Sequence, residues 1–405
     1  MNERQRTIYL DNHATTRLDP RVLEAMLPWL TDRYGNAGSV THDMGREARA
    51  AVEAAREAFA ASIGAEPREV VFTSGATESA NIAILGAASR ARDRGPGHVV
   101  TLETEHHATL DPVEHLERGG AAVTRLRVAG RDDASRVTGT VRPEDVAAAL
   151  RPDTFLVSVL LANNEIGTVQ DVAAIARVVR GHGAILHVDC AQAIGRMPVA
   201  VDDLGADLAS FSAHKFHGPK GTGALYVRRR GRAVRIDPLV FGGGQERGLR
   251  SGTLDVPGIV GLAEAARLAS EGLATESPRM RGLRDRLWTA LAAGVPGLAL
   301  NGPALEAASA AGTPARLVNN LNVRVPGVDG QSLLATLAAA GLAVSSGSAC
   351  SSESPRPSHV LLGIGLSEDE ARASLRFGLS RFTTEAEVDE AAALIVAGIA
   401  RLEAL

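Results

Sequence analysis

Short apolar runs alternate with longer alanine-rich runs of helical periodicity between about residue 40 and residue 230. The short runs are bounded by Gly, Asn or Asp, which is typical of strands, and the longer runs resemble helices. We expect strands at residues 70–73, 98–103, 155–161, 185–189, 208–212 and 223–227, and helices at 46–63, 77–91 and 172–180. This alternation predicts an α/β domain with a mainly parallel sheet, whose ligand lies beyond the carboxyl ends of the strands.

The alternation of short apolar runs and helical runs ends after Pro257. Long Ala/Leu/Arg/Glu helices are expected there, and the expected elements are helices at 258–269 and 281–293, a strand at 317–323, a helix at 331–340 and a closing helix at 385–405. A chain of 405 residues also exceeds what one core usually supports. We therefore expect an N-terminal segment (1–15), a large domain (16–260) and a smaller C-terminal α/β domain (261–405).

Composition narrows the classes of partner and compartment. The 43 basic and 47 acidic side chains give a net charge of −4, which does not favour nucleic acid or an anionic membrane as a partner. The most apolar runs, 155–162 and 333–344, are shorter than the roughly 18 residues that suggest a membrane span. Residues 1–6 mix charges and lack an apolar core, so they do not resemble a secretory signal. We expect a cytoplasmic protein in which Cys190 and Cys350 are free thiols and structural zinc is absent.

The chain contains two lysines, Lys215 and Lys220, and its other basic residues are arginines. Lys215 follows a predicted strand beside Ser212 and His214. Unlike arginine, lysine can lose its proton and form a Schiff base with an aldehyde cofactor, provided that its pKa falls from about 10.4. Lys215 is therefore a candidate catalytic amine, and the alternative is a lysine in a surface turn.

Asp189 ends the predicted strand 185–189, where a carboxylate could hold the protonated ring nitrogen of pyridoxal phosphate. The alternative is a helix N-cap. Residues 72–79 predict a strand, a tight turn and the start of a helix, whose free N–H groups suit a phosphate, although a plain helix cap explains them equally well. His106 follows another strand and could stack on a planar cofactor or relay a proton; a structural histidine is the alternative.

Two further residues stand out in the C-terminal part. Cys350 lies among small polar residues (345–352) typical of an exposed loop, where a neighbouring base would have to activate its thiol. Arg376 lies inside an apolar strand-like run and could bind a substrate carboxylate. An internal pair with Asp or Glu is the alternative for Arg376, and Arg372 and Arg381 are competitors for the substrate.

The set and order of these motifs resemble the cysteine desulfurases, which are pyridoxal-phosphate enzymes of the class V aminotransferase-like group. The resemblance runs nearly end to end, through Tyr-Leu-Asp-Asn-His-Ala-Thr-Thr (9–16), Thr-Ser-Gly-Ala-Thr-Glu-Ser (73–79), Thr-Glu-His (104–106), Asn-Asn-Glu-Ile-Gly (163–167), His-Val-Asp-Cys-Ala-Gln (187–192), Ser-Ala-His-Lys (212–215), the glycine-rich 242–253, Ser-Ser-Gly-Ser-Ala-Cys (345–350) and 375–384. It implies the fold type I of pyridoxal-phosphate-dependent transferases, similar to aspartate aminotransferase.

The resemblance also assigns roles to individual residues. Lys215 would be the Schiff-base lysine, Cys350 the nucleophile that receives sulfur, and His106 both a stacking partner of the cofactor and a proton relay. The other assignments are Asp189 on the ring nitrogen, Asn164 and Gln192 on the ring and its phenolic oxygen, Ala76, Thr77, Ser212 and His214 on the phosphate, Thr253 from the second subunit of a homodimer, and Arg376 with Asn164 on the substrate. No resident metal is implied, although Cys350 could transiently bind an iron–sulfur cluster.

The implied reaction converts L-cysteine into L-alanine and passes sulfur, as a persulfide, to an acceptor such as an iron–sulfur scaffold protein. Alternatives within the same chemistry are a selenocysteine lyase and a cysteine sulfinate desulfinase; a non-catalytic scaffold for sulfur acceptors is an alternative of another class. Three departures from the usual pattern are present: His13 and Cys190 stand where the family usually has alanine, and Asn36-Ala37 replaces a common Asn-Pro. We expect Cys190 to be a small packing residue and His13 to lie near the cofactor entrance.

Overall fold

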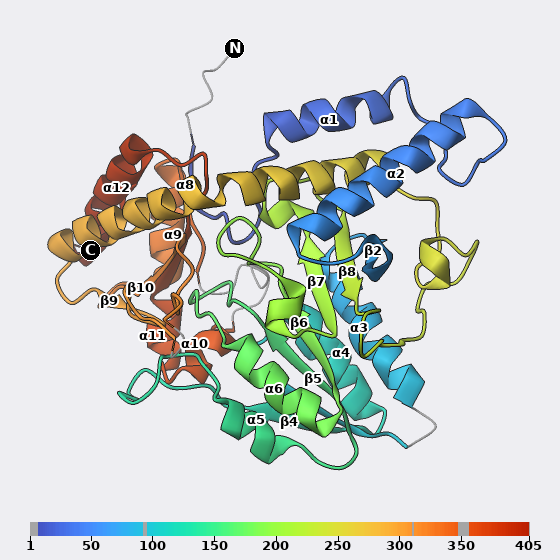
Figure 1. The fold of residues 1–405 in the computed structure, drawn as a ribbon. Coiled ribbons are helices and arrows are strands. Elements are labelled where there is room, and N and C mark those ends of the chain that lie inside the picture. Colours follow the sequence, from blue (N-terminus) through green and yellow to red (C-terminus); the bar gives the residue numbers. More distant parts are fainter. Residues whose placement is uncertain (1–6, 92–94, 310–311, 347–355, 405) are drawn as a thin grey trace.

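The computed structural model describes residues 7–91, 95–309, 312–346 and 356–404. The centre of its larger part is a sheet with seven strands among these residues, in the order β2-β8-β7-β6-β5-β3-β4 (Figure 1). The strands are β2 (Val70–Thr73), β8 (Gly223–Val227), β7 (Leu208–Ser212), β6 (Ile185–Asp189), β5 (Thr154–Leu160), β3 (His98–Leu102) and β4 (Ala122–Leu126). β8 runs antiparallel to β2 and β7, and the other neighbouring strands are parallel. The predicted mainly parallel α/β sheet is confirmed.

Helices cover both faces of this sheet because alternate strand residues point to opposite sides. Val70 and Phe72 of β2 join one hydrophobic cluster, whereas Val71 joins another with Ile82 and Val113. The helices in this part are α1 (Pro20–Leu30), α2 (Asp43–Ser62), α3 (Ala76–Ala91), α4 (His107–Arg118), α5 (Pro143–Ala149), α6 (Val172–His182) and α7 (Val201–Leu204), with short 3-10 turns at Pro67–Glu69, Ala213–Lys215 and Glu246–Gly248. The core is thus divided into two apolar layers by the sheet.

A smaller sheet lies in the C-terminal part. β10 (Asn320–Arg324) is flanked by the antiparallel strands β12 (Ser374–Gly378) and β9 (Ala299–Leu300). The remaining helices are α8 (Val256–Gly294), α9 (Gly330–Ala339), α10 (His359–Gly363), α11 (Glu368–Arg372) and α12 (Glu385–Glu403). The N-terminal strand β1 (Ile8–Tyr9) pairs in parallel with β11 (Leu342–Ala343), and Ile8 and Leu10 join the hydrophobic cluster of this part. The first described residues therefore pack with the C-terminal part before the chain enters the larger one.

The two helices predicted at 258–269 and 281–293 are wrong, because α8 is one helix of 39 residues (Figure 1). Pro278, which lies between the two expected segments, is inside this helix. The first half of α8 packs in the larger cluster through Leu262 and Leu268, and the second half packs in the smaller cluster through Leu283 and Leu287. Burial at both ends holds the helix together across a residue that lacks an N–H group. The division of the chain near residue 260 stays a prediction.

Among the other elements, the strands at 70–73, 185–189, 208–212 and 223–227 are confirmed to the residue. The helices expected at 46–63, 77–91, 172–180, 331–340 and 385–405 are also present within a few residues, whereas the strand expected at 317–323 begins later, at Asn320. No described helix combines the length and apolar character needed to cross a membrane.

Candidate active site

The predicted site residues meet at one edge of the large sheet. Strands β2, β3, β5, β6 and β7 run in the same direction, so their carboxyl ends all lie at this edge. The loops that follow them enclose a cavity of about 500 Å³, within the range of small-molecule sites. Its lining includes ten of the predicted residues: Ala76, Thr77, His106, Asn164, Asp189, Gln192, Ser212, His214, Lys215 and Arg376.

Lys215 ends a 3-10 turn that follows β7 directly. Its Nζ atom donates hydrogen bonds to the carbonyl oxygens of His13, at 2.6 Å, and Ala14, at 2.8 Å. The buried Arg196 supports this loop by donating to the carbonyl oxygens of Lys215, at 2.9 Å, and Gln192, at 3.0 Å. The amine is therefore held inside the cavity, and the alternative of a surface-turn lysine is wrong.

Asp189 is the last residue of β6 and is 7% exposed. Its Oδ1 atom accepts a hydrogen bond from the Ala191 N–H group at 2.9 Å, so it caps a turn as well as lining the cavity. Burial raises the pKa of Asp189, an effect that the Ala191 hydrogen bond and the charge of Lys215 oppose. A buried carboxylate of this kind is stabilised by a cation. The protonated ring nitrogen of pyridoxal phosphate fits that requirement.

The turn between β2 and α3 also lines the cavity. Gly75 has φ = 151°, and a Cβ atom built on Gly223 would lie 2.5 Å from the Cα atom of Gly75. The two glycines thus allow the turn to pack against β8 and to present the start of α3, with Ser212 and His214, to the cavity. Helix N–H groups with hydroxyl and imidazole donors suit a phosphate, and Lys220 also lines this cavity.

His106 is the N-cap of α4, and its Nδ1 atom accepts a hydrogen bond from the Ala108 N–H group at 3.0 Å. Nδ1 therefore carries a lone pair, and the proton of the neutral ring lies on Nε2. Burial, followed by the charges of Lys215 and His107, lowers the pKa of His106 to about 4. The ring is consequently uncharged at neutral pH, which suits stacking on a planar cofactor and hydrogen-bond donation from Nε2.

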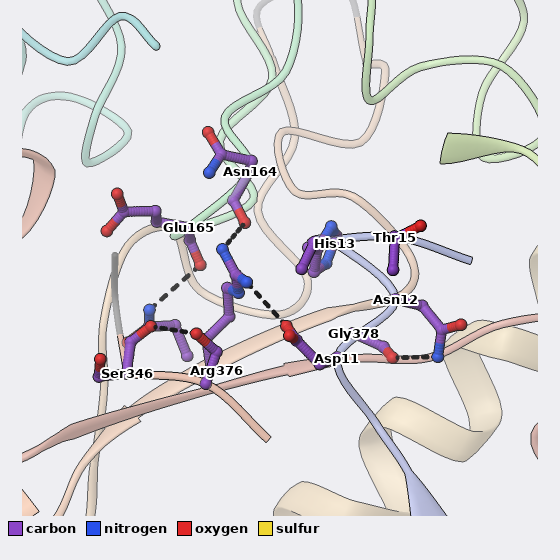
Figure 2. Close-up of polar contacts among 12 residues, drawn as sticks. Asp11, Asn12, His13, Thr15, Asn164, Glu165, Ser346, Arg376 and Gly378 are labelled. Atoms are coloured by element: carbon purple, nitrogen blue, oxygen red, sulfur yellow. Dashed lines mark hydrogen bonds and ion pairs between the residues drawn. The ribbon is translucent and has the colours of Figure 1, made fainter. Parts of the chain in front are cut away.

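Arg376 of β12 is completely buried and lines the same cavity. It donates to Asp11 Oδ1 from Nη2, at 2.8 Å, and to the Asn164 carbonyl oxygen from Nη1, at 3.3 Å (Figure 2). The internal pair with a carboxylate is thus confirmed. Its Nε atom has no hydrogen-bond partner among the described residues. Substrate binding by Arg376 stays a prediction, one that its place in the cavity supports.

The two competing arginines lie elsewhere. Arg372 ends α11 and pairs with Glu368 at 3.5 Å on the surface. Arg381 is directed to Asp19, at 3.4 Å, and Glu276, at 3.2 Å, and lines a separate small cavity. Neither lines the larger cavity that contains Asp189 and His106, although Lys215 also borders the small cavity of Arg381.

Cys350 lies outside the described residues, but Ser345 before it exchanges backbone hydrogen bonds with Arg376, at 2.7 and 3.3 Å. Thr253 is exposed and does not line the cavity of its own chain. Cys190 is 1% exposed within the large hydrophobic cluster, and burial raises the pKa of its thiol, so its predicted packing role is confirmed.

Sequence reasoning missed the part that the N-terminal segment plays in the site. Asp11 pairs with Arg376, and the His13 and Ala14 carbonyl oxygens hold Lys215. The His13 side chain lines the cavity but is 1% exposed, so it is a buried wall residue. The sequence feature that could have indicated this role is the motif 9–16, which has too many polar residues for a simple apolar strand.

Comparison with known proteins agrees with this geometry. The family model "Aminotransferase class-V" matches residues 8–391. A protein named cysteine desulfurase IscS from Anaeromyxobacter sp. (strain Fw109-5) is 49% identical over 395 residues, covering 98% of this chain and 93% of the relative. The protein of the same name from Anaeromyxobacter dehalogenans (strain 2CP-C) is 52% identical over 384 residues, covering 95% and 90%.

Solved structures give the same result. A NifS-like protein superposes with a TM-score of 0.87 at 39% identity, covering 98% of this chain and 100% of the other. DndA from Streptomyces lividans superposes with a TM-score of 0.74 at 40% identity, covering 90% and 97%. The chain therefore has the fold type I predicted for it. It belongs to the cysteine desulfurases, pyridoxal-phosphate-dependent enzymes of the class V aminotransferase family.

Proposed function

We propose that this chain converts L-cysteine into L-alanine and transfers the sulfur to Cys350 as a persulfide, for iron–sulfur cluster or thio-cofactor synthesis. One observation carries the proposal. An amine (Lys215), a buried carboxyl group (Asp189) and an uncharged imidazole (His106) line one cavity together with the guanidinium of Arg376. The name of its IscS relatives and the solved structure "SspA in complex with cysteine", at 35% identity, support the choice of cysteine.

Pyridoxal phosphate supplies, when bound, an aldehyde for amines and a conjugated ring that stabilises negative charge next to the bound amine. Asp189 would hold its ring nitrogen, His106 its face, and Ala76, Thr77, Ser212 and His214 its phosphate. Asn164 and Gln192 would contact the ring and its phenolic oxygen. These assignments are supported by the common lining of the cavity and by the buried carboxyl group that requires a cation.

Some side chains of the cavity are proposed to bind the substrate, and others to transfer protons. Arg376 and Asn164 bind and orient the substrate carboxylate through planar hydrogen bonds. The Lys215 Nζ atom takes the proton from the α-carbon and returns a proton to the product. The Nδ1 lone pair of His106 is used by the Ala108 N–H group, so the proposed proton relay near the substrate sulfur takes place at Nε2 of the uncharged ring.

Sulfur transfer is proposed to occur at Cys350. Its thiolate attacks the substrate sulfur, an S–S bond forms, and the bond between that sulfur and the substrate β-carbon breaks. The electron pair of the broken bond stays with the β-carbon, which takes up a proton to become the methyl group of alanine. Cysteine and the Cys350 thiol thus become alanine and a persulfide, with no external oxidant or reductant.

The remaining expectations concern the assembly. We propose a homodimer in the cytoplasm in which Thr253 contacts the cofactor phosphate of the second subunit, consistent with its exposure outside its own cavity. A sulfur-acceptor protein, such as an iron–sulfur scaffold, would receive sulfur from Cys350.

Replacement of Cys350 by serine tests the proposal. With L-cysteine, the wild-type protein should release alanine and acquire a mass of one additional sulfur at Cys350. Cys350→Ser should lose both signals while retaining bound cofactor, and sustained alanine release by this variant would contradict the mechanism. Relative turnover of cysteine, selenocysteine and cysteine sulfinate decides between the desulfurase and its two chemical alternatives.

A further inference from the structure

His13 is a buried histidine in the cavity wall that none of the proposed chemical steps uses. Its ring lies between two side-chain amides from distant parts of the chain. Nδ1 is 3.1 Å from Gln192 Oε1, and Nε2 is 3.2 Å from Asn320 Nδ2. Gln192 belongs to the loop after β6 and lines the cavity, whereas Asn320 begins β10. His13 therefore links the smaller sheet to the residue expected on the phenolic oxygen of the cofactor.

The direction of these hydrogen bonds is determined at the Asn320 end. The buried Arg316 guanidinium, which can only donate, lies 2.9 Å from Asn320 Oδ1. The carbonyl oxygen of Glu165, which can only accept, lies 3.0 Å from Asn320 Nδ2. The Asn320 amide is thus oriented by both contacts. Its remaining Nδ2 hydrogen is donated to His13 Nε2, which must carry a lone pair.

The direction is determined independently at the Gln192 end. Gln192 Nε2 donates to the carbonyl oxygen of His13 at 3.0 Å, so Gln192 Oε1 is the atom that faces the His13 ring. A carbonyl oxygen can only accept, and His13 Nδ1 must therefore carry the proton. Both ends of the chain of hydrogen bonds require the same Nδ1–H tautomer of His13.

Positive charge surrounds the His13 ring and excludes an imidazolium. Burial comes first among the causes that hold the pKa of His13 well below its usual range, followed by the charges of Arg196 and Arg376. Lys215 acts in the same direction. The polar groups that touch the ring are the amides of Gln192 and Asn320. His13 is thus a neutral ring with one donor and one acceptor, and both are used.

We propose that His13 is a positioning residue that, as the Nδ1–H tautomer held by Asn320, orients the Gln192 amide with an Nε2 hydrogen toward the cofactor cavity. One Nε2 hydrogen is used by the His13 carbonyl oxygen, which leaves the other for a ligand. Without the His13 donor, the contact at Gln192 Oε1 is lost and the His13 carbonyl oxygen alone holds the amide at Nε2, so the amide is less firmly oriented.

This inference rests on the proposed function, because the ligand atom that would accept this hydrogen bond is the phenolic oxygen of pyridoxal phosphate. An oxygen that carries negative charge is stabilised by an N–H donor and destabilised by a carbonyl oxygen. The expected consequence is tighter binding of the cofactor and a lower pKa of the cofactor chromophore. An apolar residue of similar size at position 13 would remove this advantage.

The first test needs no variant of His13 and no cofactor. The apoprotein labelled with ¹⁵N-histidine is compared by NMR with its Gln192→Ala variant, and the histidine whose ring nitrogen signals shift most is the one in contact with Gln192. We expect this histidine to show a protonated Nδ1 and an unprotonated Nε2 across neutral pH. The opposite tautomer would overturn the proposal.

The second test measures pyridoxal phosphate binding to the apoprotein by visible absorbance. His13→Leu should weaken binding about 5- to 10-fold, as expected for one lost hydrogen bond to a charged acceptor. His13→Asn, whose amide nitrogen replaces the Nδ1 donor, should recover binding to within about twofold of the wild type. In the Gln192→Ala background, His13→Leu should add less than about twofold.

The outcomes separate this inference from the proposed function. Wild-type apoprotein that binds no pyridoxal phosphate contradicts the proposed function itself. Normal wild-type binding with an equal effect of His13→Leu in both backgrounds shows that His13 only fills space, and overturns this inference alone. Thermal unfolding of each apoprotein identifies a variant that fails to fold, in which case the tautomer measurement decides.

Discussion

Two cavities of nearly equal size lie at opposite ends of the large sheet. The cavity at the carboxyl ends of the strands has about 500 Å³, and the one at the amino ends has about 510 Å³. The first is lined by Lys215, Asp189 and His106, and the second by residues such as Gly97, Phe155 and Ile185. Size therefore does not distinguish them, whereas the chemistry of the lining does.

The direction of the strands explains this difference. In a parallel sheet the residues that follow each strand gather at one edge, and those that precede each strand gather at the other. Here the residues after the strands include the amine, the carboxyl group and the imidazole, whereas the residues before them form connecting turns with glycine and proline. If this difference decides function, substitutions at the carboxyl ends of the strands should reduce activity and substitutions at the amino ends should not.

The largest effect is expected for Lys215→Ala. This change removes the amine that is proposed both to bind the cofactor covalently and to act as the base, so turnover of cysteine should fall by about 10⁴-fold or more. The visible absorption band of the bound cofactor should shift or vanish. An unchanged spectrum would count against the assignment of Lys215; Lys220→Ala serves as the control for loss of positive charge.

Asp189→Asn should lower turnover by about 10²- to 10³-fold, because an amide cannot stabilise a ring cation as a carboxylate does. The change preserves the size of the side chain. It also preserves the acceptor for the Ala191 N–H group, so the apoprotein should unfold at nearly the same temperature. Steady-state kinetics and thermal unfolding check both parts, and wild-type turnover would contradict the role of Asp189.

Arg376→Gln should raise KM for cysteine by about 10-fold or more with a smaller change in kcat, because it removes the proposed charged contact with the substrate carboxylate. It also leaves Asp11 without its ion-pair partner, at a cost of about 1–3 kcal/mol in the free energy of unfolding. Arg372→Gln, outside the cavity, is the control and should alter neither quantity appreciably. A change in kcat alone would argue against substrate binding.

The stability of the apoprotein should fall as the pH decreases from about 6.5 toward 4. His106 and His214, both in the cavity lining, have pKa values lowered to about 4 from 6.5, with burial as the largest cause. The unfolded chain therefore binds more protons than the folded chain between these pH values, so acid favours unfolding. His106→Gln should reduce the proton uptake on unfolding at pH 5 by up to about one proton; equal uptake in both proteins would contradict the lowered pKa.

The smallest effect is expected for Phe155→Leu in the amino-end cavity. This half-buried residue keeps its apolar character, so kcat and KM should remain within about twofold of the wild type and stability within about 1 kcal/mol. Steady-state kinetics with cysteine provide the check. A large loss of activity would show that residues at the amino ends of the strands also contribute to catalysis.

Much of the large domain could be predicted because its strands are short, apolar and bounded by turn residues. For the same reason Asp189, Lys215 and His106 could be recognised as residues at strand ends, and the family motifs then supplied their roles. The contacts of Asp11 with Arg376 and of His13 with Asn320 could not be predicted, because they join residues more than 300 positions apart. Local periodicity also divided α8 into two helices, because it does not show that the two halves of this helix are both buried, each in its own hydrophobic cluster.

Helix α8 couples the thermal unfolding of the two hydrophobic clusters because it belongs to both. Its first half belongs to the larger hydrophobic cluster and its second half to the smaller one, and β1 likewise joins the beginning of the chain to the smaller cluster. Loss of either cluster exposes half of a helix whose other half depends on continuity with it. Heating should therefore give a single calorimetric transition rather than one for each cluster, so that thermal damage would disable the whole catalyst at once.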